Sequence, residues 1–488
     1  MRYASLAPAR ADATRILACA LERVMPGPAL RRHVSLEGHT LTVAGRMYNL
    51  DDYERILVAG GGKAARRTGT ELASILGDRI TAGVLNVYRD QAHEPISERI
   101  KLFAADHPTP NEGGVEGARQ MRALLKSADA SSLVIALISG GGSSLMALPV
   151  EGISLEDYQE TSRLLLTVPA TIDEVNAVRK HVDQLKGGRM RRCARNAGGF
   201  ISLAISDTPV TSTGMVDDPS VIASGPTVGD ESTFEMACQV LSKYDIWDKT
   251  PPAVRAYIQA GLGKPDRGAL AKDSPLLAPA RSQYVIIANN DQAMEAARER
   301  AEGLGYTSYL FGWRSGTTEG KIKAEVTQEI ENIWKVVTPC LAETDQLTFA
   351  SFSTDGLDGN SGLAGAVADG DTLAAAHGRG LAYEDYIARY DSASFFTQLG
   401  LGIETGPTGT NVADICLVLV TNPNDPSRKL AFIFGGEATV KIRLPEGQPP
   451  GRGGRNTHLA LLAAEKIRGR LEQNTRLTFC HLSGIVWS

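Results

Sequence analysis

The stretch SSLVIALISGGGSSLMALP (residues 131–149) decides the fold class of this chain. Its apolar run reads as a buried strand, and three glycines and two serines follow at once. Loops of this kind bind ligands beyond the carboxyl ends of strands in parallel sheets. The loop has neither the Gly-Lys-Ser/Thr ending of a Walker loop nor a G-x-G-x-x-G pattern. If it binds an anion, the cation must come from elsewhere in the chain.

Strands alternate with helices on both sides of this stretch. The sequence predicts strands over 55–60, 81–88, 101–110, 131–139 and 199–206, and helices within 61–77 and over 113–128, 155–168 and 171–190. This alternation is typical of an α/β fold, in which a parallel sheet carries helices on both faces.

The alternation of strands and helices resumes after a polar, Pro- and Gly-containing stretch at 260–280, which we interpret as a domain junction. Beyond it the sequence predicts strands over 282–289, 347–353, 414–420 and 429–436 and helices over 291–305 and 457–472. We therefore expect two α/β domains, residues 1–265 (Rossmann-like) and 280–488, each with a mostly parallel sheet.

Composition narrows the class of protein. The 488 residues are 43% hydrophobic and 22% charged with a net charge of −5, which is globular and argues against a broad nucleic-acid surface. No apolar run reaches the ~18 residues of a membrane span. The first 27 residues favour an amphipathic helix rather than a signal peptide. We expect a cytoplasmic protein, with mitochondrial targeting left open.

Small and polar residues follow the predicted strands. Any one of these loops could be a simple turn, but six at the same sheet edge indicate a ligand site. The candidate nucleotide-binding residues are Gly61, Gly62, Ser139, Gly140, Gly141, Gly142, Ser143, Ser144, Asn289, Thr408, Gly409, Thr410 and Asn411. Asp355 and Glu437 follow two further strands and are candidates for the substrate side.

Four basic residues are candidate anion partners. Lys63 follows three glycines at a predicted helix start, where a positive charge is unfavourable, so we expect an anion nearby. Arg455 lies in GRGGRN, and its planar guanidinium suits a carboxylate or phosphate. Arg179 and Lys186 fall near one face of the predicted helix. That face points either at substrate or at solvent.

Acidic residues supply the remaining candidates. Asp207 ends a predicted strand, and Asp218 follows in an acidic loop. Both suit Mg²⁺ held through water, as phosphoryl transfer requires. Asp207 could instead accept a proton from a hydroxyl nucleophile. The histidines show no H-x-x-x-H or H-E-x-x-H spacing, which argues against a zinc site.

Taken together, these motifs resemble the glycerate 2-kinase family, whose C-terminal half is called the MOFRL domain. The matching blocks are VAGGGKAA, LISGGGSSLMALP, VNAVRKHVDQLKGGRM, SVIASGPT, STDGLDG, TGPTGTNVAD, FGGEATV and GRGGRN, and they span about 50–480. The resemblance implies transfer of the ATP γ-phosphoryl group to the 2-hydroxyl of D-glycerate with Mg²⁺. It implies a deep cleft between the two α/β domains. It also implies that Lys63 and Arg455 are the phosphate- and substrate-binding cations, and that Asp207 is the aspartate after the Ser-Asp strand end.

The chain departs from the family pattern in three places. Extra residues interrupt the segment after Asp207, and Thr457 replaces the family's Gln. The second-half blocks are also swapped, since STDGLDG and TGPTGTNVAD precede FGGEATV and GRGGRN. QLTFASFSTDG (346–356) is partly repeated as RLTFCHLSG (476–484). We hypothesise a circularly permuted second domain, which termini lying close in space would tolerate.

Three functions stay open at this point. The first is ATP-dependent phosphorylation of D-glycerate to 2-phosphoglycerate, with Lys63, Asp207 and Arg455 as catalytic residues. The second is an NAD(P)-dependent hydroxypyruvate reductase, a name given to some chains of this family, although G-x-G-x-x-G is missing. The third is a non-catalytic sugar-acid-binding protein. In each case the partner is a small molecule, and a homodimer is left open.

Overall fold

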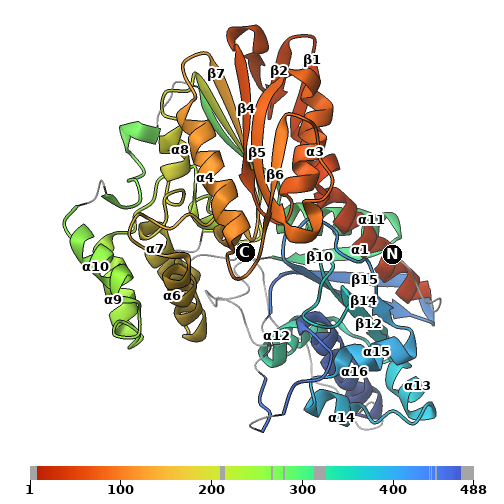
Figure 1. Ribbon diagram of the computed structural model, residues 1–488. Helices are drawn as coiled ribbons and strands as arrows, with labels where there is room; N and C mark the ends of the chain where they lie inside the picture. Colours follow the sequence, from red (N-terminus) through yellow and green to blue (C-terminus); the bar gives the residue numbers. More distant parts are fainter. Residues whose placement is uncertain are drawn as a thin grey trace.

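The computed structural model describes residues 8–208, 215–264, 267–277, 281–312, 326–438, 440, 442–445 and 448–473. Residues 471–473 are described by their helical backbone alone. The first sheet has six parallel strands in the order β6-β5-β4-β7-β8-β9 (Figure 1). Its strands are β4 (Arg55–Gly61), β5 (Ile80–Tyr88), β6 (Ile100–Ala105), β7 (Ser132–Ile138), β8 (Gly199–Ile205) and β9 (Ser282–Ala288). The predicted parallel α/β domain is confirmed.

The central strand β7 explains why the opening stretch shows no hydrophobic alternation. It lies between β4 and β8, and all seven of its residues are buried. Leu133, Ile135 and Leu137 pack into one core cluster, whereas Val134, Ala136 and Ile138 pack into another. A strand covered on both faces needs apolar side chains at every position.

Helices cover both faces of this sheet. α4 (Glu112–Lys126) contacts β4, β5 and β6, and its Met121 belongs to the cluster of Val134. α3 (Ala65–Leu76) contributes Leu72 to the opposite cluster. The other helices of this half are α2 (Pro26–His33), α5 (Gly142–Leu145), α6 (Leu155–Thr167), α7 (Ile172–His181), α8 (Arg189–Cys193), α9 (Phe234–Lys243) and α10 (Pro252–Gly261).

The predicted helix over 171–190 is wrong, because two helices occupy that range. α7 ends at His181 and α8 begins at Arg189. Between them the Asp183 carboxylate accepts the main-chain N–H groups of Leu148, at 3.0 Å, and Leu185, at 2.8 Å. These bonds draw the main chain into a turn, so Arg179 and Lys186 do not share a helical face.

The second sheet is mixed, and the prediction of a mostly parallel sheet there is wrong. Its order is β10-β15-β14-β11-β12-β13, and only β10 and β15 run parallel. β14 and β15 pair from Asp414↔Gly436 to Asn422↔Asp425, and two residues join them. So short a connection can link antiparallel strands only. The strands are β10 (Thr307–Phe311), β11 (Gln346–Ser353), β12 (Gly365–Asp369), β13 (Gly402–Ile403), β14 (Asp414–Asn422) and β15 (Asp425–Gly436).

The helices of this half lie on both sides of the mixed sheet. α16 (Arg455–Gln473) contacts β11 and β12, and α11 (Asn290–Gly303) contacts β10 and β15. The remaining helices are α12 (Val326–Val337), α13 (Thr372–Gly378), α14 (Tyr383–Ala388) and α15 (Ser392–Leu399). A small antiparallel sheet of β1 (Val34–Glu37), β2 (Thr40–Val43) and β3 (Arg46–Asn49) completes the fold.

The two sheets divide the chain differently from the predicted ranges 1–265 and 280–488. β9 pairs with β8, so the first sheet extends to Ala288. The N-terminal helix α1 (Pro8–Val24) packs instead on the second half, against α11, β11 and β14 (Figure 1). One buried cluster runs from Leu17 of α1 to both sheets, for example to Ile135 and Ile415. The halves therefore share a core.

Part of the swapped segment lies in the second sheet. β15, whose last three residues begin the FGGEATV block, lies between β10 and β14. The partial repeat at 476–484 lies outside the described residues. The circular permutation stays a prediction. Among the described helices, none combines the length and apolar character needed to cross a membrane.

Candidate active site

A cavity of about 480 Å³ lies where the loops after the parallel strands meet the second half of the chain. Lys63 follows β4, His107 follows β6, and Asp207 follows β8. Parallel strands bring their carboxyl ends to one edge, which is why loops distant in sequence converge there. The remaining polar lining residues are Gly140, Gly141, Ser143, Ser144, Arg179, Thr208, Asn411 and Glu437.

Two glycine-rich loops dock against one another to form one wall. The Lys63 main-chain N–H donates to the Gly140 carbonyl at 2.8 Å, and the Ala64 N–H donates to Ser139 Oγ at 3.1 Å. A Cβ atom on Gly62 would lie 2.2 Å from Ser139 Oγ. Gly62 and Ser139 are therefore needed to build the wall, and neither lines the cavity among the described residues.

Lys63 forms an ion pair with Asp355 of the second half, Nζ to Oδ2 at 3.0 Å. Burial disfavours the ammonium charge, but Asp355, Tyr88 and Asp207 together raise the pKa of Lys63. Burial likewise opposes the charge of Asp355, and Lys63 outweighs it, so the pKa of that carboxyl is lowered. Both groups are charged at neutral pH. Lys63 is thus a cation that lies beside the Gly-rich loop of Gly140.

Arg179 is the second cation of the cavity. Burial lowers the pKa of its guanidinium, which nevertheless remains protonated at neutral pH. Within the part of the chain that the structure describes, no carboxylate forms an ion pair with it. An Arg without a counter-ion beside a cavity is suited to an anionic ligand.

His107 also faces the cavity, and the sequence reasoning missed it. Desolvation, together with Lys63 and Arg179, lowers the pKa of His107 to about 4, so the imidazole is neutral at neutral pH. The available signal was the His-Pro-Thr-Pro sequence at 107–110, since prolines end a strand and would place His107 at the ligand edge of the sheet.

Asp207 is the carboxylate of the first half that lines the cavity. Its Oδ2 accepts a hydrogen bond from Asn411 Nδ2 at 2.9 Å. A Cβ atom on Gly140 would lie 1.9 Å from the same oxygen. The aspartate therefore packs directly on the Gly-rich loop, which requires glycine at 140.

The two serines of the loop differ in their partners. Ser144 Oγ donates to the Pro108 carbonyl at 2.8 Å, which fixes the loop that carries His107. Ser143 Oγ lies 2.7 Å from Ser224 Oγ, and either oxygen can donate. Because a hydroxyl both donates and accepts, Ser143 keeps capacity for a ligand at the cavity.

Arg455 does not present a free cation to this cavity. It forms ion pairs with Asp414 and with Glu437, the latter at 2.7 Å between Nη1 and Oε1. Burial raises the pKa of Asp414 to about 6 despite Arg455, and the two acids in turn raise the pKa of the arginine. Arg455 lines a neighbouring cavity of about 440 Å³, with Glu437 shared by both.

Several other predicted residues serve the structure rather than the cavity. Lys186 is buried and pairs with Asp183, which corrects its predicted role in substrate binding. Asn289 caps α11 and donates to Asp217 at 2.7 Å. Thr408 and Thr410 donate to the carbonyls of Thr354 and Val24, at 2.6 and 2.8 Å. Gly61, Gly142 and Gly409 also lie outside the cavity lining, as the described residues define it.

The two predicted magnesium ligands do not meet. Asp218 lines a different cavity of about 420 Å³, whereas Asp207 lines the cleft. The described residues contain no group of three or more His, Cys, Asp or Glu side chains placed to hold a metal ion. A Mg²⁺ ion that arrives with a nucleotide needs only one or two protein carboxylates, because phosphates and water supply its other ligands. Asp207 fits that requirement.

Comparison with known protein families identifies both halves of the chain. A domain of unknown function, DUF4147, matches residues 12–259, and the MOFRL family matches residues 326–414. The MOFRL match ends at the first residue of β14, so the FGGEATV and GRGGRN blocks follow it.

Similar proteins cover most of the chain. A glycerate 2-kinase from Pyrococcus horikoshii is 32% identical over 84% of this chain and 96% of the relative. A putative hydroxypyruvate reductase from Agrobacterium vitis is 32% identical over 75% of this chain and 99% of the relative. The crystal structure of a glycerate kinase from Thermotoga maritima superposes with a TM-score of 0.67, at 26% identity, over 84% of this chain and 98% of that one.

Proposed function

This chain belongs to the glycerate 2-kinase family described by the DUF4147 and MOFRL domains, and from that premise we propose that it phosphorylates D-glycerate to 2-phosphoglycerate with ATP. The observation that carries the proposal is the convergence of two cations, Lys63 and Arg179, and one carboxylate, Asp207, on one cavity. Two cations suit the transferred phosphoryl group and the substrate carboxylate, and the aspartate suits the reacting hydroxyl.

Lys63 is placed to neutralise charge on the transferred phosphoryl group. Phosphoryl transfer depends on positioning and on stabilising charge that spreads over the phosphoryl oxygens. The ion pair with Asp355 holds the ammonium in place before the ligands arrive. Preorganised charges of this kind require no rearrangement during the reaction.

Arg179 is the partner proposed for the glycerate carboxylate. A guanidinium binds a carboxylate through two parallel N–H donors, which fixes the orientation of a small acid. The apolar wall beside it, formed by Leu165, Val168 and Val175, limits competition by water. This division of roles places the nucleotide phosphates on the Gly140–Ser144 side.

Asp207 is proposed to orient the 2-hydroxyl and to accept its proton as the oxygen attacks phosphorus. Asn411 holds one carboxylate oxygen, which fixes the orientation of the group. Asp207 is the residue that would hold a Mg²⁺ ion arriving with ATP, and the ion would supply further neutralisation of the phosphates. The neutral imidazole of His107 can donate or accept a hydrogen bond beside the phosphates.

The reductase alternative lacks the complete glycine pattern of a dinucleotide loop. The loop at the end of β4 reads GGGKAA (60–65), with alanine at the position of the third glycine. SGGGSS after β7 lacks the spacing, and the helix that follows it is only four residues long. Coupled assay of ADP formation, with and without D-glycerate, separates the functions. Hydroxypyruvate-dependent oxidation of NADH without ADP formation would overturn the kinase proposal, and so would glycerate binding without any turnover.

The position of phosphorylation needs its own measurement. Phosphorus NMR of the product distinguishes a phosphate on the 2-hydroxyl from one on the 3-hydroxyl. We expect 2-phosphoglycerate, since the family relatives from Pyrococcus horikoshii and Thermotoga maritima are named glycerate 2-kinase and D-glycerate 2-kinase. A cytoplasmic location and a homodimer remain part of this proposal.

A further inference from the structure

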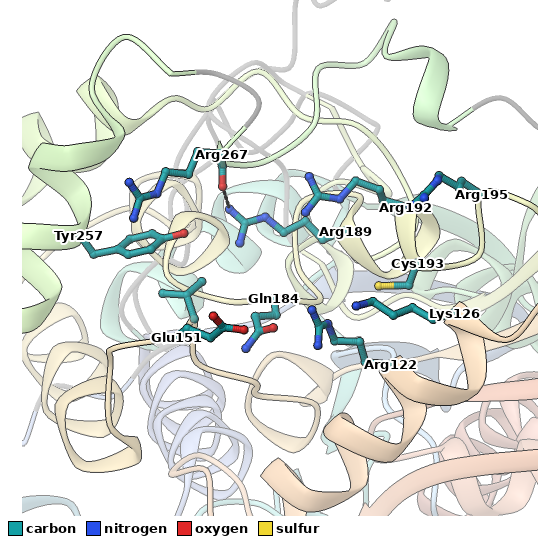
Figure 2. Close-up of a pocket in the computed structure, with 11 residues that line it drawn as sticks. Arg122, Lys126, Glu151, Gln184, Arg189, Arg192, Cys193, Arg195, Tyr257 and Arg267 are labelled. Carbon is teal, nitrogen blue, oxygen red and sulfur yellow. Dashed lines mark hydrogen bonds between the residues drawn. The ribbon is translucent and has the colours of Figure 1, made fainter.

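A second cavity, of about 700 Å³, lies between α4, the α8 region and the segment around Tyr257, and its lining differs from that of the active site (Figure 2). Six basic side chains and one carboxylate, Glu151, line it, a formal charge of +5 in a chain whose net charge is −5. The basic residues are Arg122, Lys126, Arg189, Arg192, Arg195 and Arg267. We call this the basic cavity.

Arg189 is the buried member of the basic cavity. Its guanidinium donates to three main-chain carbonyls, those of Asp183, Gly268 and Arg267, and the described residues provide no ion pair for it. Burial lowers the pKa of Arg189, and the charge of Arg192 acts in the same direction, whereas Tyr257 and Asp183 act against it. A buried cation without an ion pair favours an anion nearby.

Arg122 and Lys126 extend from one face of α4 toward α8, which carries Arg192 and Cys193 (Figure 2). Burial raises the pKa of the Cys193 thiol, and the charges of Arg122, Arg192, Lys126 and Arg195, which line the same cavity, oppose that rise. Ion pairs to carboxylates are absent for Arg122, Lys126 and Arg195 over the residues that the structure describes. These three cations repel one another, and a bound anion would remove that repulsion.

We propose that the basic cavity binds a small molecule carrying at least two phosphate groups. The size of the cavity fits a small molecule, and a formal charge of +5 exceeds what one phosphate would neutralise. Arg supplies the planar donors that phosphate oxygens accept. The net charge of −5 for the whole chain argues for a small ligand over a nucleic acid.

Cys193 provides a readout at the cavity itself, separate from the active site. In the full-length protein, iodoacetamide alkylation of Cys193 is followed by peptide mass spectrometry, with Cys238 as an internal reference. Inorganic tripolyphosphate is the probe, and potassium chloride at equal ionic strength is the screening control. We expect tripolyphosphate to slow the alkylation of Cys193 but not of Cys238, and orthophosphate to do so only at higher concentration.

Variants test whether the cavity cations cause the protection. Arg122→Gln removes a cavity charge, whereas Arg119→Gln removes a charge from the same helix that pairs with Glu116 outside the cavity. We expect Arg122→Gln to need about tenfold more tripolyphosphate for the same protection, and Arg119→Gln to behave as the parent. Lys126→Gln, at an exposed position, repeats the test with no risk to folding.

Two results would overturn the proposal. One is protection of Cys193 by potassium chloride equal to that by tripolyphosphate, and the other is equal protection in Arg122→Gln and Arg119→Gln. Protection should persist in Lys63→Ala, because the active-site cavity is a separate one. Loss of protection in that variant would place the bound anion in the active site instead.

Discussion

Lys63 Nζ and Asp355 Oδ2 lie 3.0 Å apart, although 292 positions separate the two residues. The lysine comes from the loop after β4, and the aspartate follows β11 of the other sheet. This pair joins the two halves of the chain at the active-site cavity. It therefore links the geometry of the phosphate site to the packing of the sheets.

Replacing Lys63 with Ala should lower kcat by about 100-fold to 1,000-fold, because the charge that stabilises the phosphoryl group is removed. The variant also leaves the largely buried Asp355 carboxylate without its partner, so a fall in the thermal unfolding midpoint should accompany the loss of activity. The assay is glycerate-dependent ADP formation. Lys466→Ala, which breaks an exposed pair with Glu331, is the matched control and should retain full activity. Near-normal turnover in Lys63→Ala would exclude the lysine from catalysis.

Arg179 and Lys186 were predicted as equivalent substrate ligands, and the structure separates them. Arg179→Gln should raise KM for glycerate by at least tenfold with little change in stability, since the guanidinium faces the cavity. Lys186→Met should destabilise the protein by about 3–5 kcal/mol, because it leaves the Asp183 carboxylate buried and unpaired. Steady-state kinetics and urea unfolding measure the two effects. The reverse pattern would contradict the assignment.

Gly140→Ala tests the contact between the Gly-rich loop and Asp207. The added methyl group would meet Asp207 Oδ2 at 1.9 Å, so the carboxylate must move away from its bond to Asn411. We expect a fall in kcat of about 100-fold, as misplacement of a reacting group produces. Gly303→Ala at the end of α11, where no atom lies within 4 Å, is the control and should keep normal kinetics.

His181 predicts a pH dependence of stability. Burial lowers its pKa to about 4, whereas the unfolded chain binds a proton near pH 6.5. As the pH falls, the unfolded state binds the proton before the folded state does. The contribution of the neutral His181 to the free energy of unfolding is therefore fully present above about pH 6.5. It is lost as the pH falls toward 4, by up to about 1.4 kcal/mol per pH unit.

His181→Leu removes this titrating group, so the variant is compared directly with the parent protein. The free energy of unfolding, measured with urea between pH 7 and pH 4, should fall less steeply for the variant than for the parent. Parallel curves for the two proteins would show that His181 does not carry the effect. Kinetic assays at pH 7 should be similar, because His181 packs against Phe234 away from the cavity.

The sequence by itself determined the first sheet and the edge at which ligands bind. These features can be recognised from local sequence. Only an apolar strand such as β7 fits between two helical layers, and only glycine fits where the loops at the ends of β4 and β7 touch. For that reason Lys63, Gly140, Ser143 and Asp207 could be named in advance, and all four line the cavity.

Tertiary structure alone decided which charged residues remain available to a ligand. Arg455 and Lys186 have the same side-chain chemistry as Arg179 and Lys63, but they pair with Asp414, Glu437 and Asp183 and lie outside the lining of the active-site cavity. Lys63 lines that cavity although it pairs with Asp355. The strand directions of the second sheet and the place of α1 were likewise decided by pairing across the fold. The physical reason is that charge compensation and strand pairing depend on distance in space, which residue types and their spacing along the chain do not fix.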